Sequence, residues 1–127
     1  MSKPVFEDLF RFSGRRNRKS YILYLVALFV FEAIIWAVAS TITHVSGRWV
    51  PVDIAGAISI PCAISGWAVG SQRCRDFGWT GWAMLITLIP YVGWIFALAI
   101  IFIPGTEGPN RYGPDPLGGV SHSYGLA

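Results

Sequence analysis

The sequence predicts an all-α integral membrane protein, a polytopic bundle of transmembrane helices. Hydrophobic residues make up 54% of the 127 residues and charged residues only 13%. Soluble domains carry about 25% charged residues, and a small domain has a large surface to cover. The apolar residues also gather into three long runs, at 21–43, 54–71 and 80–103. These observations exclude a soluble globular enzyme. They also exclude disorder for most of the chain, because disorder requires low hydrophobicity and high charge.

The first apolar run, residues 21–43, is long enough to cross a membrane, since about 20 helical residues span a hydrocarbon core of roughly 30 Å. Tyr21 and Tyr24 lie at its basic end, where interfacial aromatic residues are typical. The Ala-Val-Ala sequence at 37–39 imitates a signal-peptide cleavage site. The long leader before the run and Glu32 within it favour a retained transmembrane helix.

The second run, residues 54–71, is shorter and rich in small residues. Gly66 and Gly70 are four positions apart, and small residues at that spacing let helix backbones approach closely in lipid. We therefore expect these two glycines to form a helix-packing face on the second span.

The third run, residues 80–103, is divided by the sequence Pro-Tyr-Val-Gly at 90–93 into two pieces that are each too short to span a membrane. The run forms either one span kinked at Pro90 or two half-helices in a re-entrant hairpin. Kinked spans are common, and re-entrant hairpins need cover by other protein. Of the two structures, we expect the single kinked span.

The two flanks differ in character. Residues 5–10 place four apolar side chains at helical spacing, which predicts a short interfacial helix lying on the bilayer. After Pro104, glycine and proline alternate, which predicts an irregular C-terminal tail. We expect a single membrane domain over 1–117 and disorder over 118–127.

Basic residues predict the orientation in the membrane. Six of the ten Lys and Arg residues precede Tyr21, and Arg73 and Arg75 follow the second span. The loop between the first two spans carries only His44 and Arg48. The positive-inside rule therefore places the N-terminus in the cytoplasm. A nucleic-acid partner is not expected, because basic residues beside a long apolar run more often set membrane orientation.

Three stretches of sequence together resemble one known family. They are Phe-Ser-Gly-Arg-Arg-Asn-Arg-Lys-Ser-Tyr at 12–21, Arg-Cys-Arg-Asp-Phe-Gly-Trp-Thr-Gly-Trp at 73–82, and Pro-Gly-Thr-Glu-Gly-Pro-Asn-Arg-Tyr-Gly-Pro-Asp-Pro at 104–116. Their order and spacing resemble the domain-of-unknown-function family 805, small bacterial inner-membrane proteins. The resemblance covers residues 6–116 and implies a location in the bacterial inner (cytoplasmic) membrane. It implies no established activity.

The chain departs from this family's middle motif, which usually reads Arg-Arg-Leu-His-Asp-x-Gly. Here Gln72, Cys74 and Arg75 replace the first Arg, the Leu and the His. If the family's His has a protonation role, this chain cannot share it.

Glu32 is the first candidate functional residue, because a charged carboxylate near mid-bilayer costs about 2.5–3.5 kcal/mol on insertion scales. It serves either as an ion or proton site or as an interhelical anchor, and the sequence offers no second acid or base at its depth. We expect Glu32 to face the bundle and to share a hydrogen bond with Ser59, Cys62 or Ser65 of the second span.

The remaining candidates are polar residues of the three motifs. The basic ones are expected to form a cytoplasmic patch that either attracts anionic lipid headgroups, at about 1 kcal/mol per residue, or only sets topology. Those of the tail are expected either to dock over the helix ends or to form a termination loop. The candidates are Arg15, Arg18, Arg73, Arg75 and Asp76, followed in the tail by Asn110, Arg111 and Asp115.

No phosphate loop, dinucleotide fingerprint, nucleophile elbow or metalloprotease motif appears in the sequence. We therefore expect neither an enzyme nor a cofactor or metal site. Two classes of function remain. The first is a scaffold or accessory protein that binds lipid headgroups, another membrane protein or a second copy of the chain. The second is a minimal oligomeric transporter or channel that uses Glu32.

Overall fold

The computed structural model describes residues 3–117, and helices are its only extended regular structure in that range. They are α1 (Arg18–Ser46), α2 (Val50–Asp76), the 3-10 helix η1 (Gly81–Leu88) and α3 (Val92–Phe102). The predicted all-helical fold is thus confirmed for these residues. The tail predicted to be disordered, 118–127, lies outside the described residues.

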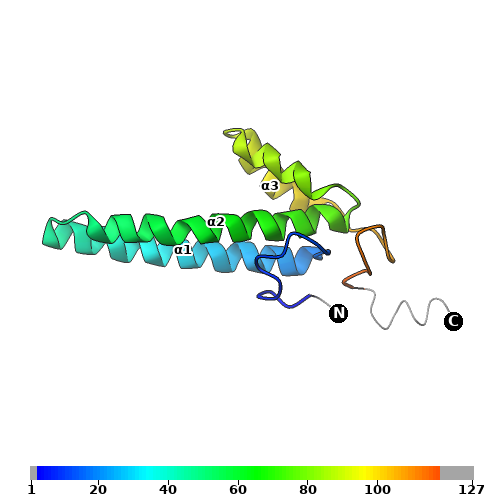
Figure 1. Ribbon diagram of the computed structural model, residues 1–127, viewed down its shortest axis with the longest axis horizontal. Helices are drawn as coiled ribbons and strands as arrows, with labels where there is room; N and C mark the ends of the chain where they lie inside the picture. The colour runs from blue at the N-terminus through cyan, green and yellow to red at the C-terminus, as the bar shows by residue number, and fades with distance from the viewer. Residues whose placement is uncertain (1–2, 118–127) are drawn as a thin grey trace.

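The two long helices form an antiparallel hairpin (Figure 1). α1 contains neither glycine nor proline, and at about 1.5 Å per residue its 29 residues are about 43 Å long. It ends at Gly47, whose left-handed φ of 69° lets its N–H bond the Thr43 carbonyl at 2.8 Å. α2 starts with proline in its first turn and continues through Pro61.

Both long helices are long and apolar enough to cross a membrane. Only 11% of the most apolar stretch of α1, and 22% of that of α2, is buried within the protein. A core helix of a soluble protein is mostly buried, so these exposed apolar faces are suited to lipid.

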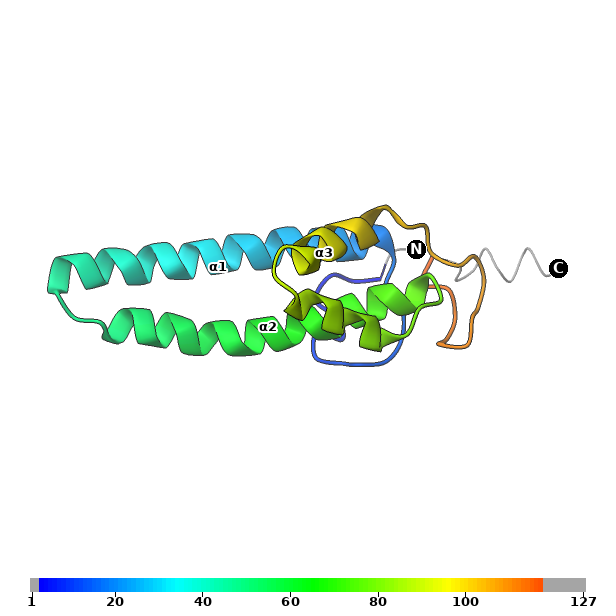
Figure 2. The same cartoon turned by 90° about the horizontal axis from the view of Figure 1, so that it is seen from above.

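The third apolar run forms two short helices, η1 and α3, which fold back on each other beside the half of the long hairpin that is nearer the termini (Figures 1 and 2). The expected single kinked span is therefore not formed. The run instead forms a hairpin, which was the alternative that the sequence left open. Neither short helix is long enough to cross a membrane alone.

Two residues explain why the chain turns back here. Pro90 lacks an N–H, which removes a helix hydrogen bond and favours a break in the helix. Gly93 lets the start of α3 lie against Thr87, since a Cβ on Gly93 would come within 2.7 Å of the Thr87 Cα. The turn also satisfies its own backbone, because Ile89 N–H bonds Ile86 O at 3.0 Å and Gly93 N–H bonds Ile89 O at 2.8 Å. The cover that we expected from other protein is therefore partly supplied by the turn itself.

The N-terminal segment, residues 3–16, forms consecutive turns, so the predicted interfacial helix is wrong. Asp8 has a left-handed φ of 55°, which interrupts a helix. In addition, the carbonyls that a helix would use internally accept hydrogen bonds from distant side chains. For example, Leu9 O accepts from Ser65, and Asp8 O and Arg11 O accept from Gln72.

Candidate functional site

The residues of the three sequence motifs meet at one end of the long hairpin. There the N-terminal segment, the last turn of α2, the end of α3 and the C-terminal segment 103–117 lie together (Figures 1 and 2). Four arginines and one aspartate are buried at this end, each no more than 8% exposed, and we call them the arginine core. Its members are Arg15, Arg16, Arg73, Arg75 and Asp76.

Arg15 ties the C-terminal segment to the end of α2. Its guanidinium pairs with Asp76 Oδ1 at 3.1 Å. The remaining donors reach backbone carbonyls of the C-terminal segment, at 2.6 Å to Thr106, 2.7 Å to Gly108 and 3.2 Å to Gly113. One side chain therefore fixes the path of most of the third motif.

Arg16 organises the N-terminal segment in the same way. It donates to the carbonyls of Pro4, Val5 and Glu7, and to Gln72 Oε1 at 3.1 Å. Burial lowers the pKa of its guanidinium, whereas the negative charge of Asp8 raises it.

Arg73 holds the end of α3 against α2. Its Nε donates to Ile100 O at 3.0 Å, and its Nη2 donates to Ile103 O. These are carbonyls at a helix C-terminus, which lack partners within the helix and carry partial negative charge. Arg73 also pairs with Asp76 Oδ2, so the Asp76 carboxylate is shared between two arginines.

The four guanidinium groups outnumber the single carboxylate of the core. Backbone carbonyls from four segments accept most of the remaining guanidinium donors, and charge-assisted hydrogen bonds of this kind are the strong ones. Arg73 and Arg75 also lie in the last turn of α2, where the helix dipole favours cations. The arginine core therefore holds the terminal segments and the end of α3 against the end of α2.

The C-terminal segment docks on the arginine core, in agreement with the first of the two expectations, that the tail docks over the helix ends. Asn110 donates to Arg75 O at 2.8 Å, and Asp115 accepts from Gly108 N at 3.0 Å. Thr106 N–H bonds Asp76 O at 2.6 Å. Arg111 instead is exposed and lies over the Tyr112 ring, with 4.8 Å between its Cζ and the ring centroid.

The structure therefore changes the view of the predicted basic patch. Arg15, Arg73 and Arg75 are buried donors to internal groups and form no exposed patch, whereas Arg18 is exposed together with Lys19. The burial follows from the carbonyl-rich loops that the motifs wrap around the arginines.

The sequence reasoning missed two residues of this network, Arg16 and Gln72. Arg16 was one of several cations in a run, and nothing in the run distinguishes the buried positions from the exposed ones. Gln72 was noted only as a departure from the family motif. Its position beside that motif was the available signal.

Glu32 lies far from the arginine core, on the facing sides of α1 and α2. Its Oε2 accepts from Ser59 at 2.7 Å and from Trp36 Nε1 at 3.1 Å. Trp36 also bonds Ser59 at 3.1 Å, which closes a three-residue network between the helices. The expected hydrogen bond to the second helix is confirmed, with Ser59 as the donor.

The two glycines of the predicted packing face behave differently. A Cβ on Gly70 would come within 2.7 Å of Met84 Sδ, so Gly70 lets η1 pack closely on α2. A Cβ on Gly66 would meet only Leu28 Cδ2, at an ordinary 3.9 Å. The close approach that a glycine allows is therefore present at Gly70, against η1, whereas Gly66 faces Leu28 of α1 at an ordinary contact distance.

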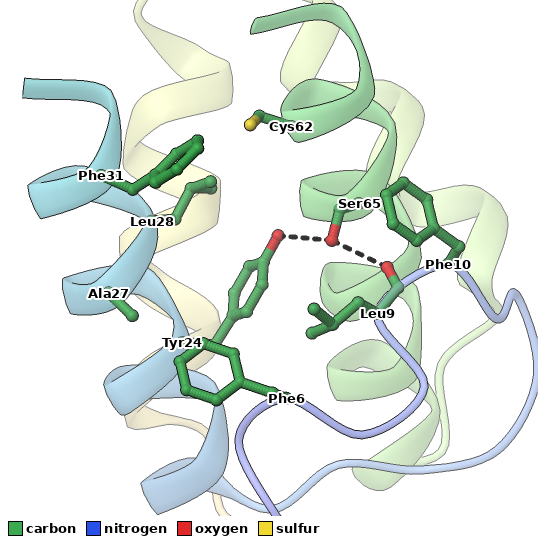
Figure 3. Close-up of a pocket in the computed structure, with 9 residues that line it drawn as sticks. All are labelled: Phe6, Leu9, Phe10, Tyr24, Ala27, Leu28, Phe31, Cys62 and Ser65. Carbon is green, nitrogen blue, oxygen red and sulfur yellow. Dashed lines mark hydrogen bonds between the residues drawn. The ribbon is translucent and has the colours of Figure 1, made fainter. Parts of the chain in front are cut away.

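Figure 3 shows a second feature at this end, a cavity of about 310 Å³ between the N-terminal segment and the long helices. Its few polar groups are paired with one another, because Tyr24 donates to Ser65 Oγ and Ser65 donates to Leu9 O, each at 2.8 Å. The rest of the lining is apolar apart from the Cys62 thiol. Across residues 3–117, no group of three His, Cys, Asp or Glu residues could hold a metal ion.

Comparison with known proteins places these motifs in a family. Residues 9–114 match the family described as protein of unknown function (DUF805). The chain is 28% identical over 114 residues to inner membrane protein YhaH of Escherichia coli strain K12, covering 88% of this chain and 92% of YhaH. It is 30% identical over 113 residues to inner membrane protein YhaI of the same organism, covering 88% of this chain and 91% of YhaI. No solved structure matches the chain. Since the family match spans the first two motifs, most of the third and most of the chain, this protein belongs to the DUF805 family of proteins of unknown function.

Proposed function

We propose that this protein is a non-enzymatic accessory or scaffold protein of the bacterial inner membrane, which binds lipid headgroups or another membrane protein at its arginine-core end. The observation that carries the proposal is the use of the motif arginines. Arg15, Arg16 and Arg73 donate to internal carbonyls and to Asp76 or Gln72, which stabilises a fixed surface and leaves no reactive group poised for chemistry.

The distribution of charge supports a cytoplasmic location for this end. Nine of the ten Lys and Arg residues lie there, Arg48 at the opposite end being the exception. The positive-inside rule then places both the N-terminal and the C-terminal segments in the cytoplasm. The η1–α3 hairpin enters the membrane from that side and returns to it.

The exposed side chains of this end supply the binding surface. Arg18 and Lys19 are exposed at the start of α1, and Arg111 is exposed in the C-terminal segment. Each cation near an anionic membrane surface contributes about 1 kcal/mol. The same cations are suited to an acidic segment of a partner protein.

The test is affinity purification of the tagged full chain from native membranes, followed by quantitative mass spectrometry of bound protein and lipid. We expect Arg18→Gln combined with Lys19→Gln to reduce the amount of bound anionic lipid or partner severalfold. The matched control is Arg48→Gln, which removes an exposed cation from the opposite end. Equal recovery from the double variant and the control would contradict the proposal.

A second candidate function is transport, and one observation favours it. Glu32 lines a groove of about 720 Å³ between α1 and α3, and its Oε1 is buried without a hydrogen-bond partner in the described chain. A transporter should show proton flux in proteoliposomes containing a pH-sensitive dye, and Glu32→Gln should abolish that flux. An accessory protein should show no flux, and Glu32→Gln should leave partner and lipid recovery unchanged.

A further inference from the structure

A cavity of about 540 Å³ lies between the second half of α2 and η1, and it is closed by one residue from each terminal segment. Its volume falls within the roughly 300–1,000 Å³ that is typical of small-molecule sites. Four aromatic rings and one guanidinium dominate the lining: Phe12, Trp67, Trp82, Tyr112 and Arg75.

The polarity of this cavity changes along its length. Trp67, Ser71 and Arg75 line it from one face of α2, at positions i, i+4 and i+8, and therefore extend over about 12 Å of helix. The apolar member lies toward the membrane-crossing part of α2, and the cation lies at the helix end. On the other side, η1 contributes Met84 and Leu85. The cavity therefore offers a charged end and an apolar end in the order in which a cytoplasmic-leaflet lipid presents them.

Arg75 has fewer partners than the other arginines of the core. Arg15 and Arg73 share the Asp76 carboxylate, whereas neither Arg16 nor Arg75 forms a salt bridge with a carboxylate of residues 3–117. Arg16 nevertheless donates hydrogen bonds from all three of its side-chain nitrogens. Its side chain is buried, since the residue is 8% exposed. Its Nη2 donates to Phe12 O, but Nη1 is buried and bonds no described residue. A buried guanidinium with an unused donor and no counter-ion is costly.

We infer that this cavity binds one anionic amphiphile from the membrane, with its phosphate or carboxylate on Arg75 and an acyl chain along Trp67 and Leu85. The inference rests on the proposed function for the placement of this end at a membrane surface. An oxyanion supplies the missing counter-charge and an acceptor for Nη1, and planar guanidinium groups suit phosphate and carboxylate geometry. Gly81 leaves room for the guanidinium, because a Cβ there would lie 3.0–3.1 Å from its Nη2, Cζ and Nη1 atoms.

The cavity of Figure 3 shows by contrast what this site has in addition. That cavity is more apolar, its hydroxyl groups already bond one another, and no cation lines it. The cavity between α2 and η1 combines an unused donor of a buried cation with an apolar channel, which the cavity of Figure 3 does not.

The test is native mass spectrometry of the delipidated full chain, titrated with three probes of matched chain chemistry. They are dioleoylphosphatidylglycerol, oleate and dioleoylglycerol, the last of which lacks an oxyanion. We expect one molecule of dioleoylphosphatidylglycerol or oleate to bind per chain, and the tighter of the two identifies the source as phospholipid or fatty acid. Equal binding of dioleoylglycerol, or displacement of bound lipid by inorganic phosphate alone, would overturn the inference.

The variants locate the site. Arg75→Met should weaken binding of the anionic probe at least about tenfold, since a charge-assisted hydrogen bond and the counter-charge are lost together. Unchanged affinity in folded Arg75→Met would overturn the inference. Where Arg75→Met does not fold, Trp82→Ala replaces it, with Trp94→Ala as a control of similar exposure outside the cavity (77% and 74%). Trp82→Ala should weaken binding severalfold more than Trp94→Ala, and equal effects would overturn the inference.

The same titration separates this site from the exposed cations of the proposed function. Arg18→Gln combined with Lys19→Gln should keep the one probe molecule in the cavity with the affinity of the unmodified chain, and lose only the anionic lipid that binds at the exposed surface. Loss of binding in that variant, with full binding in Arg75→Met, would overturn the cavity site and leave the proposed headgroup surface standing.

Discussion

Gly105 lies directly against the carboxylate of Asp76. A Cβ on Gly105 would come within 2.8 Å of the Asp76 Cγ and would overlap one of its oxygens. The carboxylate cannot move aside, because it pairs with Arg15 and Arg73 at the same time. The glycine of the third motif is therefore required by the aspartate of the second.

This contact makes Gly105→Ala a sensitive substitution. We expect it to lower the free energy of unfolding by about 1–3 kcal/mol, the range typical of overpacking a closely packed site. The measurement is thermal or denaturant unfolding of the purified protein in detergent. Gly56→Ala is the control, since a Cβ there meets nothing within 4 Å. If both variants unfold like the unmodified chain, the close approach of the two motifs is wrong.

Asp76→Asn tests the charge balance of the arginine core. The substitution keeps the size of the side chain but removes the one carboxylate that pairs with the buried Arg15 and Arg73. Breaking a buried ion pair from one side costs about 3–5 kcal/mol, and we expect a loss of that order in the free energy of unfolding.

The matching control for Asp76→Asn is Asp53→Asn, an exposed aspartate in the first turn of α2. Its loss removes only a favourable interaction with the helix dipole, worth about 0.3–1 kcal/mol. Similar small losses in both variants would show that the core carbonyls alone stabilise the arginines.

The packing of η1 on α2 is tested at Gly70. Gly70→Ala forces the Met84 side chain out of its present place, since Met84 Sδ lies 2.7 Å from the position of the new Cβ. We expect destabilisation of about 1–3 kcal/mol, with partial recovery when Met84→Ala is added to make room. Gly66→Ala should be neutral, because its new methyl group makes only an ordinary contact. A destabilised Gly66→Ala together with a tolerated Gly70→Ala would reverse our assignment of the packing face.

The long helices could be predicted from the sequence because their signal is local. An apolar run of about twenty residues indicates a transmembrane helix by its length alone, and α1 and α2 contain the predicted spans. The conformation of the third run could not be predicted in this way. It depends on the approach of Gly93 to Thr87 and on hydrogen bonds within the turn, which the periodicity of the sequence does not reveal.

The candidate site was predicted in part for a similar reason. The motifs identified Arg15, Arg73 and Asp76, and the possibility that the motifs share one face was visible from the charges. Their burial was not predictable, since charged residues are almost never fully buried unless paired. Their partners are mostly backbone carbonyls of distant segments, such as Thr106 O and Ile100 O. Every residue has a backbone carbonyl, so the sequence does not show which carbonyls accept these hydrogen bonds.

The position of the C-terminal segment gives the last prediction. Thr106 bonds the end of α2 and Arg15 bonds Gly108, so the C-terminal segment lies at the same end as the N-terminal segment. With the proposed cytoplasmic N-terminus, two membrane crossings and a returning hairpin predict that this segment lies on the cytoplasmic side, whereas a third crossing would put it outside. The contacts that fix the C-terminal segment involve buried side chains. Surface ion pairs, which contribute little, are therefore not needed to hold the segment at this end.

Cysteine labelling measures this directly in a chain whose own Cys62 and Cys74 are replaced by alanine. Glu107→Cys places a thiol on the exposed part of the C-terminal segment, and Arg48→Cys places one in the loop between α1 and α2. On intact spheroplasts, an impermeant maleimide should label Arg48→Cys at once and Glu107→Cys only after lysis. Labelling of both before lysis would mean that the third apolar run crosses the membrane, and the contacts of Arg15 with the C-terminal segment could then not exist in the bilayer. Labelling of Glu107→Cys alone would invert the whole orientation while keeping the hairpin, because both terminal segments would still share one side.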